Sequence, residues 1–138
     1  MEKGITYVGL DAHKEALNVA MLLPGQTRPV EWQTSNDAAA VRRMVKKAQR
    51  AAGGEVRFCY EAGPCGFWIY RELAALGERC MVVSPALVPR RAGDHVKTDR
   101  RDSERLASLA RAGELEPIHV PDIRDEASPV LEGIARTL

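Results

Sequence analysis

The sequence predicts an α/β domain with a mixed five-stranded sheet and flanking helices. Two observations support this fold class. Three short apolar runs near the N-terminus are joined by short turns, and two further runs each follow a helical segment. Strands joined by short turns pair antiparallel, whereas a strand reached through a helix runs parallel to an earlier one.

The expected strands are short runs rich in β-branched and aromatic residues, a pattern typical of strands buried on both faces of a sheet. They cover residues 5–10, 16–23, 29–34, 55–60 and 79–83. The first run leads directly into Asp11, and residues 12–15 form a tight turn into the second. We therefore expect Asp11 to be held where a central strand leaves the core.

The first expected helix follows the third strand, with Ser35 or Asn36 as its N-cap and Asp37 in its first turn. Gly53 and Gly54 are expected to end it. Its apolar residues recur at helical spacing, and a basic face lies away from them. We expect this face to be solvated surface rather than a nucleic-acid contact; it consists of Arg42, Arg43, Lys46, Lys47 and Arg50.

The second helix is expected to begin near Pro64 and to end at Gly77. Phe67, Trp68 and Tyr70 crowd its start, where packing against the sheet is favoured over stacking on a base. A third helix follows the last strand. Three antiparallel strands that lead into parallel ones through crossovers form the layout of the ribonuclease H-like fold.

Composition limits the classes of protein that fit. The chain has 138 residues, 45% hydrophobic and 28% charged, which is the profile of one soluble globular domain. The formal net charge is +1, so any nucleic-acid contact must come from local clusters of basic residues. Three cysteines without paired spacing argue against disulfides and a structural zinc site. No run approaches the roughly 20 apolar residues of a membrane span, so we expect a cytoplasmic protein without a membrane segment.

Four acidic residues follow expected strands or begin the last helix. Asp11 and Glu61 end two strands expected to be parallel neighbours, and such ends meet at one edge of a sheet. Asp99 and Asp102 are three residues apart, so both project from one face of a helix expected to end at Gly113.

Hard oxygen ligands such as these suit Mg²⁺ or Mn²⁺. Two ions about 3.5–4 Å apart can activate a nucleophile and stabilise the leaving oxygen of a phosphodiester. Each acid also has a structural explanation. Asp11 could bond the backbone of its own turn, and Asp99 and Asp102 could cap the helix or pair with neighbouring arginines.

Basic residues surround the last two acids, and we expect them to hold phosphates in a salt-sensitive, sequence-independent manner. The alternative is that they neutralise nearby carboxylates. These basic residues are Lys97, Arg100, Arg101 and Arg105. His13 and Lys14 flank Asp11, and a surface turn is the favoured position for both.

Four blocks resemble, in order, the motifs of the DEDD-type transposases of bacterial insertion sequences, whose N-terminal domain is RuvC-like. The blocks are YVGLDAHK at residues 7–14, YEAG at 60–63, VSP at 83–85 and KTDRRD at 97–102. The resemblance extends over residues 5–121, and the last block is its most specific part. It implies that Asp11, Glu61, Asp99 and Asp102 are the catalytic acids and the metal ligands. Ser103 stands where the family more often has alanine.

The resemblance also implies a function. Such a protein is a DNA recombinase that excises and inserts its element, with Mg²⁺ as cofactor and a structured guide RNA that selects the DNA sites. It acts as a homo-oligomer, and a second, C-terminal domain supplies a serine that attacks the DNA. We expect residues 1–121 to form the catalytic domain. Residues 122–138 would then be a tail or the start of a connection to a second domain that this chain lacks.

Two other functions remain open from the sequence. The first is a stand-alone RuvC-like junction resolvase or nuclease. The second is a truncated module without catalysis that binds nucleic acid or dimerises.

Overall fold

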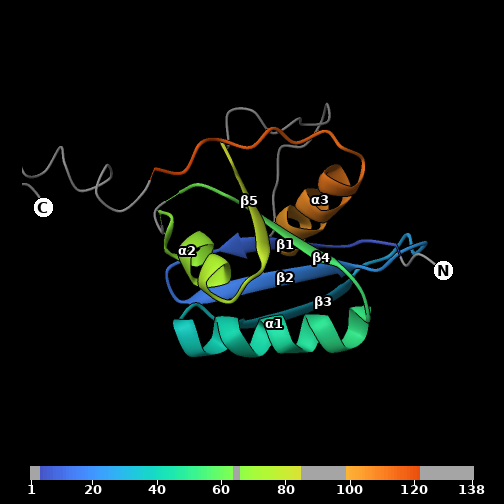
Figure 1. Ribbon diagram of the computed structural model, residues 1–138, viewed down its shortest axis with the longest axis horizontal. Helices are drawn as coiled ribbons and strands as arrows, with labels where there is room; N and C mark the ends of the chain where they lie inside the picture. The colour runs from blue at the N-terminus through green and yellow to red at the C-terminus, as the bar shows by residue number, and fades with distance from the viewer. Residues whose placement is uncertain (1–3, 64–65, 85–98, 122–138) are drawn as a thin grey trace, which may run out of the picture.

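The computed structural model describes residues 4–63, 66–84 and 99–121, with only the backbone described for residues 99–101. In this part of the chain, five strands and three helices follow one another in the predicted order (Figure 1). The elements are β1 (Thr6–Ala12), β2 (Ala16–Leu22), β3 (Val30–Ser35), α1 (Ala38–Ala52), β4 (Val56–Glu61), α2 (Trp68–Ala75), β5 (Arg79–Val83) and α3 (Asp99–Arg111).

The sheet has the strand order β3-β2-β1-β4-β5, with β1 at its centre. β1 pairs antiparallel with β2, and β2 with β3. β4 lies parallel to β1 and β5 lies parallel to β4, as expected for strands reached through helices. This arrangement confirms the predicted fold class, an α/β ribonuclease H-like domain with a mixed five-stranded sheet.

Helices cover both faces of the sheet, with α1 and α3 on opposite sides (Figure 1). Val8 and Leu10 of β1 pack in one core cluster with residues of α1 and α2. Gly9 faces the other way, toward α3. A Cβ atom at Gly9 would lie 2.3 Å from the carbonyl oxygen of Ser103, so α3 rests directly on the backbone of β1.

The N-cap of α1 is Asp37, so the prediction of Ser35 or Asn36 was wrong. Asp37 has an extended backbone, and its side chain accepts a hydrogen bond of 2.9 Å from the N–H of Ala40. This bond lowers the pKa of the Asp37 carboxyl. Ser35 cannot cap the helix because it pairs with Ala16 in the sheet. The helix ends at Gly53, as predicted, with a positive φ of 65°.

The basic face of α1 is exposed to solvent, as predicted. Two of its residues also make local contacts. Arg42 forms an ion pair with Glu72 at 3.2 Å, and the Lys47 ammonium lies 4.2 Å from the centroid of the Trp32 ring.

α2 begins at Trp68, later than predicted, and Pro64 lies outside the described residues. Phe67, Trp68 and Tyr70 pack against the core cluster beneath α1 and α2, which confirms the expected packing role. Gly77 follows the helix with a φ of 81°, as the sequence predicts for a helix end.

The segment after α3 returns to the edge of the sheet at β5. The N–H of Ile118 donates to the carbonyl of Val82 at 2.8 Å, and Arg71 donates to the carbonyl of Pro121 at 3.1 Å. Residues up to Pro121 therefore pack on the domain, whereas the expected tail at 122–138 lies outside the described residues. Cys59 and Cys80 are free thiols. Within the described segments, no helix is long and apolar enough to cross a membrane.

Candidate active site

β1 and β4 bring Asp11 and Glu61 to neighbouring positions. Leu10 pairs with Tyr60 in the parallel register, and the next residue is Asp11 on β1 and Glu61 on β4. Paired strands lie about 4.8 Å apart, so the two acids leave the sheet as neighbours. Both strands extend further than the sequence predicted, and both acids consequently lie within strands.

Both acids are on the face of the sheet that α3 covers. Gly9 approaches the α3 backbone, and the Cys59 thiol donates to the carbonyl of Leu106 at 3.6 Å. Side chains alternate along a strand, so Asp11 and Glu61, each two residues further on, point to that same face. Asp11 is only partly accessible, with 16% of its side chain exposed.

α3 carries the other two predicted acids. Asp99 is the first residue of this helix and Asp102 the fourth, and Asp102 is half-buried. The side chain of Asp99 lies outside the description. Among the side chains that are described, no three acids, histidines or cysteines are close enough together to hold a metal ion.

The predicted phosphate-binding residues fall mostly outside the description. Lys97 is not among the described residues, and only the backbone is described for Arg100 and Arg101. Arg105 is half-buried on α3 and interacts with other groups of the protein.

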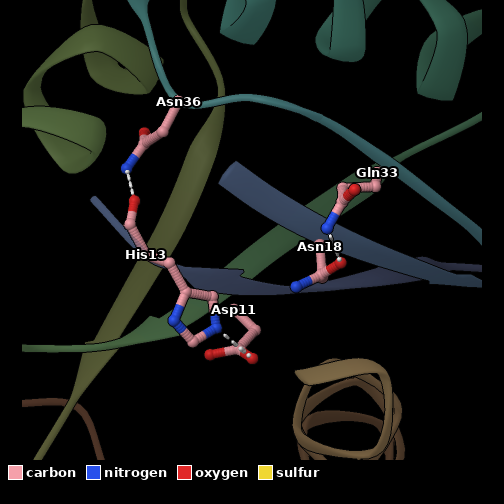
Figure 2. Close-up of polar contacts among 5 residues, drawn as sticks. All are labelled: Asp11, His13, Asn18, Gln33 and Asn36. Carbon is pink, nitrogen blue, oxygen red and sulfur yellow. Dashed lines mark hydrogen bonds and ion pairs between the residues drawn. The ribbon is translucent and has the colours of Figure 1, made fainter. Parts of the chain in front are cut away.

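His13 is a direct partner of Asp11. Its Nε2 lies 2.9 Å from Oδ2 of Asp11, and 42% of its side chain is exposed (Figure 2). The turn that carries His13 is held in two places. Its N–H donates to the carbonyl of Ala16 at 2.8 Å, and its carbonyl accepts from Nδ2 of Asn36 at 2.6 Å. His13 and Lys14 both lie in the turn between β1 and β2, as predicted, and Lys14 is exposed. The sequence analysis did not predict the contact between His13 and Asp11.

A row of polar side chains crosses the sheet beside Asp11, a feature that the sequence analysis missed. Asp11 is directly opposite Asn18 on β2, which is opposite Gln33 on β3. Nε2 of Gln33 donates to Oδ1 of Asn18 at 3.0 Å (Figure 2). An amide inside an otherwise apolar strand, across a short hairpin from Asp11, is the signal that could have revealed it.

Asn18 is 9% exposed, and its Nδ2 is buried without a hydrogen-bond partner among the described residues. A buried N–H donor without a hydrogen-bond partner lowers the free energy of unfolding by about 1–3 kcal/mol. Most buried polar groups in native proteins have partners, so this atom calls for an explanation.

The chemistry of the donors fits a hard divalent cation. Asp11 and Glu61 offer carboxylate oxygens at adjacent strand ends, and carboxylates are preferred ligands of Mg²⁺. Cys59 lies on the same face, but burial raises the pKa of its thiol to about 12, so a thiolate is not available at neutral pH. The two described acids at the strand ends therefore offer oxygen donors, and Cys59 offers no thiolate beside them.

Comparisons with known proteins agree with this fold. A family model described as transposase, that of the DEDD transposases of the IS110 type, matches residues 8–128. The putative transposase y4qE of Sinorhizobium fredii (strain NBRC 101917 / NGR234) is 44% identical over 123 residues, which cover 88% of this chain and 31% of that protein. The transposase for insertion sequence element IS1533 of Leptospira borgpetersenii is 36% identical over 107 residues, covering 77% of this chain and 31% of that protein.

Together, the fold and the comparisons place the chain in the class of transposase-family proteins. More narrowly, the chain belongs to the DEDD transposase family of the IS110 type, which confirms the resemblance seen in its motifs. The chain spans about a third of the length of these two relatives, 31% of each.

Proposed function

We propose that this chain is the metal-dependent catalytic domain of a transposase that cleaves and transfers DNA strands. One observation carries the proposal. Asp11 and Glu61 continue two paired parallel strands at the centre of the sheet, and both face α3, the helix that holds Asp99 and Asp102. This arrangement supports a shared site for acids from three separate parts of the sequence.

In this proposal all four acids are ligands of Mg²⁺, or of Mn²⁺ in its place. The metal, when bound, supplies positive charge that polarises the scissile phosphate and offsets charge that develops during phosphoryl transfer. The protein positions the ligands. β1 and β4 fix the backbones of Asp11 and Glu61, and the Asp11 carboxylate is also held by His13.

The basic residues around the start of α3 hold the DNA backbone in this proposal. Lys97, Arg100, Arg101 and Arg105 would contact phosphates, and the resulting affinity should fall as the salt concentration rises. These contacts position the DNA but do not read its sequence.

The partners proposed for the whole protein follow from its family. They are DNA, a structured guide RNA, further copies of the same protein, and a second catalytic domain with a nucleophilic serine. The length of the two relatives supports a further domain, because the chain matches only 31% of each.

Titration of Mn²⁺ into the 138-residue chain, followed by calorimetry, tests the site. The wild type is expected to bind the ion, and Asp11→Asn to bind it at least tenfold more weakly, because the substitution removes a charged ligand. Asp37→Asn is the matched control, since it makes the same chemical change at the N-cap of α1 on the other side of the sheet. Equal affinity in wild type and Asp11→Asn would contradict the proposal.

Incubation with branched DNA separates the transposase from a stand-alone nuclease. The 138 residues alone are expected not to cleave the substrate, because the proposed reaction needs a second domain. Metal-dependent cleavage of branched DNA by this chain would favour the resolvase or nuclease function.

A further inference from the structure

We infer that Asn18 is a positioning residue for Asp11: its Nδ2, which has no partner among the described residues, is placed to donate to the Asp11 carboxylate when a cation is bound, and so to hold that carboxylate in the orientation that binds the cation. The inference rests on the proposed function, because it takes Asp11 to be a metal ligand. It adds β2 and β3, which contribute none of the four acids, to the parts of the sheet that support the site.

Burial and register place Asn18 beside Asp11. The two residues are directly opposite each other in the antiparallel β1–β2 pair, so their side chains emerge on the same face of the sheet. Directly opposite Cβ atoms lie about 4.5–5.5 Å apart, which puts an amide and a carboxylate within reach of each other through side-chain rotation alone.

Gln33 determines which end of the Asn18 amide is turned toward Asp11. Because Nε2 of Gln33 donates to Oδ1 of Asn18, the Nδ2 end is left on the side of β1. Figure 2 shows this end turned away from Gln33, toward the side on which Asp11 and His13 lie. The reverse orientation would turn the amide oxygen toward a carboxylate, and two acceptors repel each other.

The burial of Nδ2 excludes a direct contact with a DNA phosphate. This atom is inaccessible to solvent and has no partner among the described residues, whereas a phosphate arrives from solvent. Asp11 is the acidic residue opposite it in the sheet. β4, which carries Glu61, and β2, which carries Asn18, flank β1 on opposite sides, so a cation shared by Asp11 and Glu61 would lie away from β2.

Asn18→Leu tests the inference, because leucine has a similar volume but no donor. The variant is expected to remain folded, as judged by circular dichroism and urea unfolding, and to bind Mn²⁺ about tenfold more weakly than the wild type in calorimetry. Gln33→Leu provides the same test without a change at the buried position. It is expected to weaken Mn²⁺ binding by a smaller factor, because the Asn18 amide is then free to rotate.

Thr6→Val is the matched control. The Thr6 hydroxyl is also buried without a partner among the described residues, but Thr6 lies on the face of β1 that carries Val8 and Leu10. Its substitution is expected to leave the affinity for Mn²⁺ unchanged.

The outcomes separate this inference from the function on which it rests. If Asn18→Leu and Gln33→Leu are folded and bind Mn²⁺ as the wild type does, the amides are structural only and the inference is overturned, while the metal site stands. If the wild type itself binds no Mn²⁺, the proposed function fails and the inference fails with it.

Discussion

At the scale of single residues, Cys59 shows how strongly the α3 side of the sheet is protected from water. It is 1% exposed and lies two residues before Glu61 on the same face. Burial raises the pKa of its thiol to about 12, and only a thiolate reacts readily with alkylating reagents.

We expect Cys59 to resist iodoacetamide in the folded protein at pH 8, and to react fully once the chain is unfolded in urea. Peptide mass spectrometry after a timed reaction measures the modified fraction. Rapid alkylation of Cys59 in the folded protein would show that α3 does not stay packed over β4.

Single residues near the site differ in how well the sequence predicts them. The positions of Asp11 and Glu61 beside each other in the sheet could be predicted, because each follows an apolar run of strand length; their role as metal ligands stays a prediction. The place of Asn18 beside Asp11 could not be predicted, because it depends on the strand register that sets the two residues opposite each other. The contact between His13 and Asp11 likewise depends on the shape of a turn that Asn36 holds from a distant part of the chain.

At the scale of elements, the close contact between α3 and β1 determines where the helical acids lie. Gly9 is the contact point, because a Cβ atom there would lie 2.3 Å from the Ser103 carbonyl oxygen and 2.7 Å from the Ala107 nitrogen. Both are backbone atoms, which cannot move aside as a flexible side chain can.

We expect Gly9→Ala to destabilise the protein by about 1–3 kcal/mol, since it forces the helix away from the strand. Urea unfolding at neutral pH measures the loss. Gly63→Ala is the control, because a Cβ atom at Gly63 would meet nothing within 4 Å. If the two variants proved equally stable, the close packing of α3 on β1 would be wrong.

Elements were predictable in kind and order, because the length and periodicity of apolar runs determine both. Their ends were less predictable. The sequence analysis placed the N-cap of α1 too early, because Ser and Asn are also favoured N-cap residues. Ser35 is excluded as the N-cap only by its pairing with Ala16 in the sheet, which the sequence does not reveal. The position of α3 over Gly9 depends on tertiary packing, which periodicity does not specify.

At the scale of the whole molecule, the two acids proposed to bind metal are expected to lower the stability of the metal-free protein. Asp11 and Glu61 place two negative charges on adjacent strands, and like charges at such a distance repel each other. A cation bound at the proposed site would remove this repulsion, so the protein should gain stability when the ion is added.

We expect Glu61→Gln to be at least as stable as the wild type without metal. With Mn²⁺ at a hundred times its Kd, the wild type should gain about 2.7 kcal/mol, whereas Glu61→Gln should gain much less. Thermal unfolding with and without Mn²⁺, with Mg²⁺ as a second ion, measures both effects. An identical gain in the two proteins would remove Glu61 from the site.

The most direct test of the central claim is a crystal structure of the chain soaked in Mn²⁺, with anomalous diffraction data. We expect an anomalous peak about 2.1 Å from carboxylate oxygens of both Asp11 and Glu61, on the face covered by α3, with oxygens of Asp99 or Asp102 also bonded to it. A fully soaked crystal with no peak between Asp11 and Glu61, or with manganese bound only elsewhere, would contradict the account.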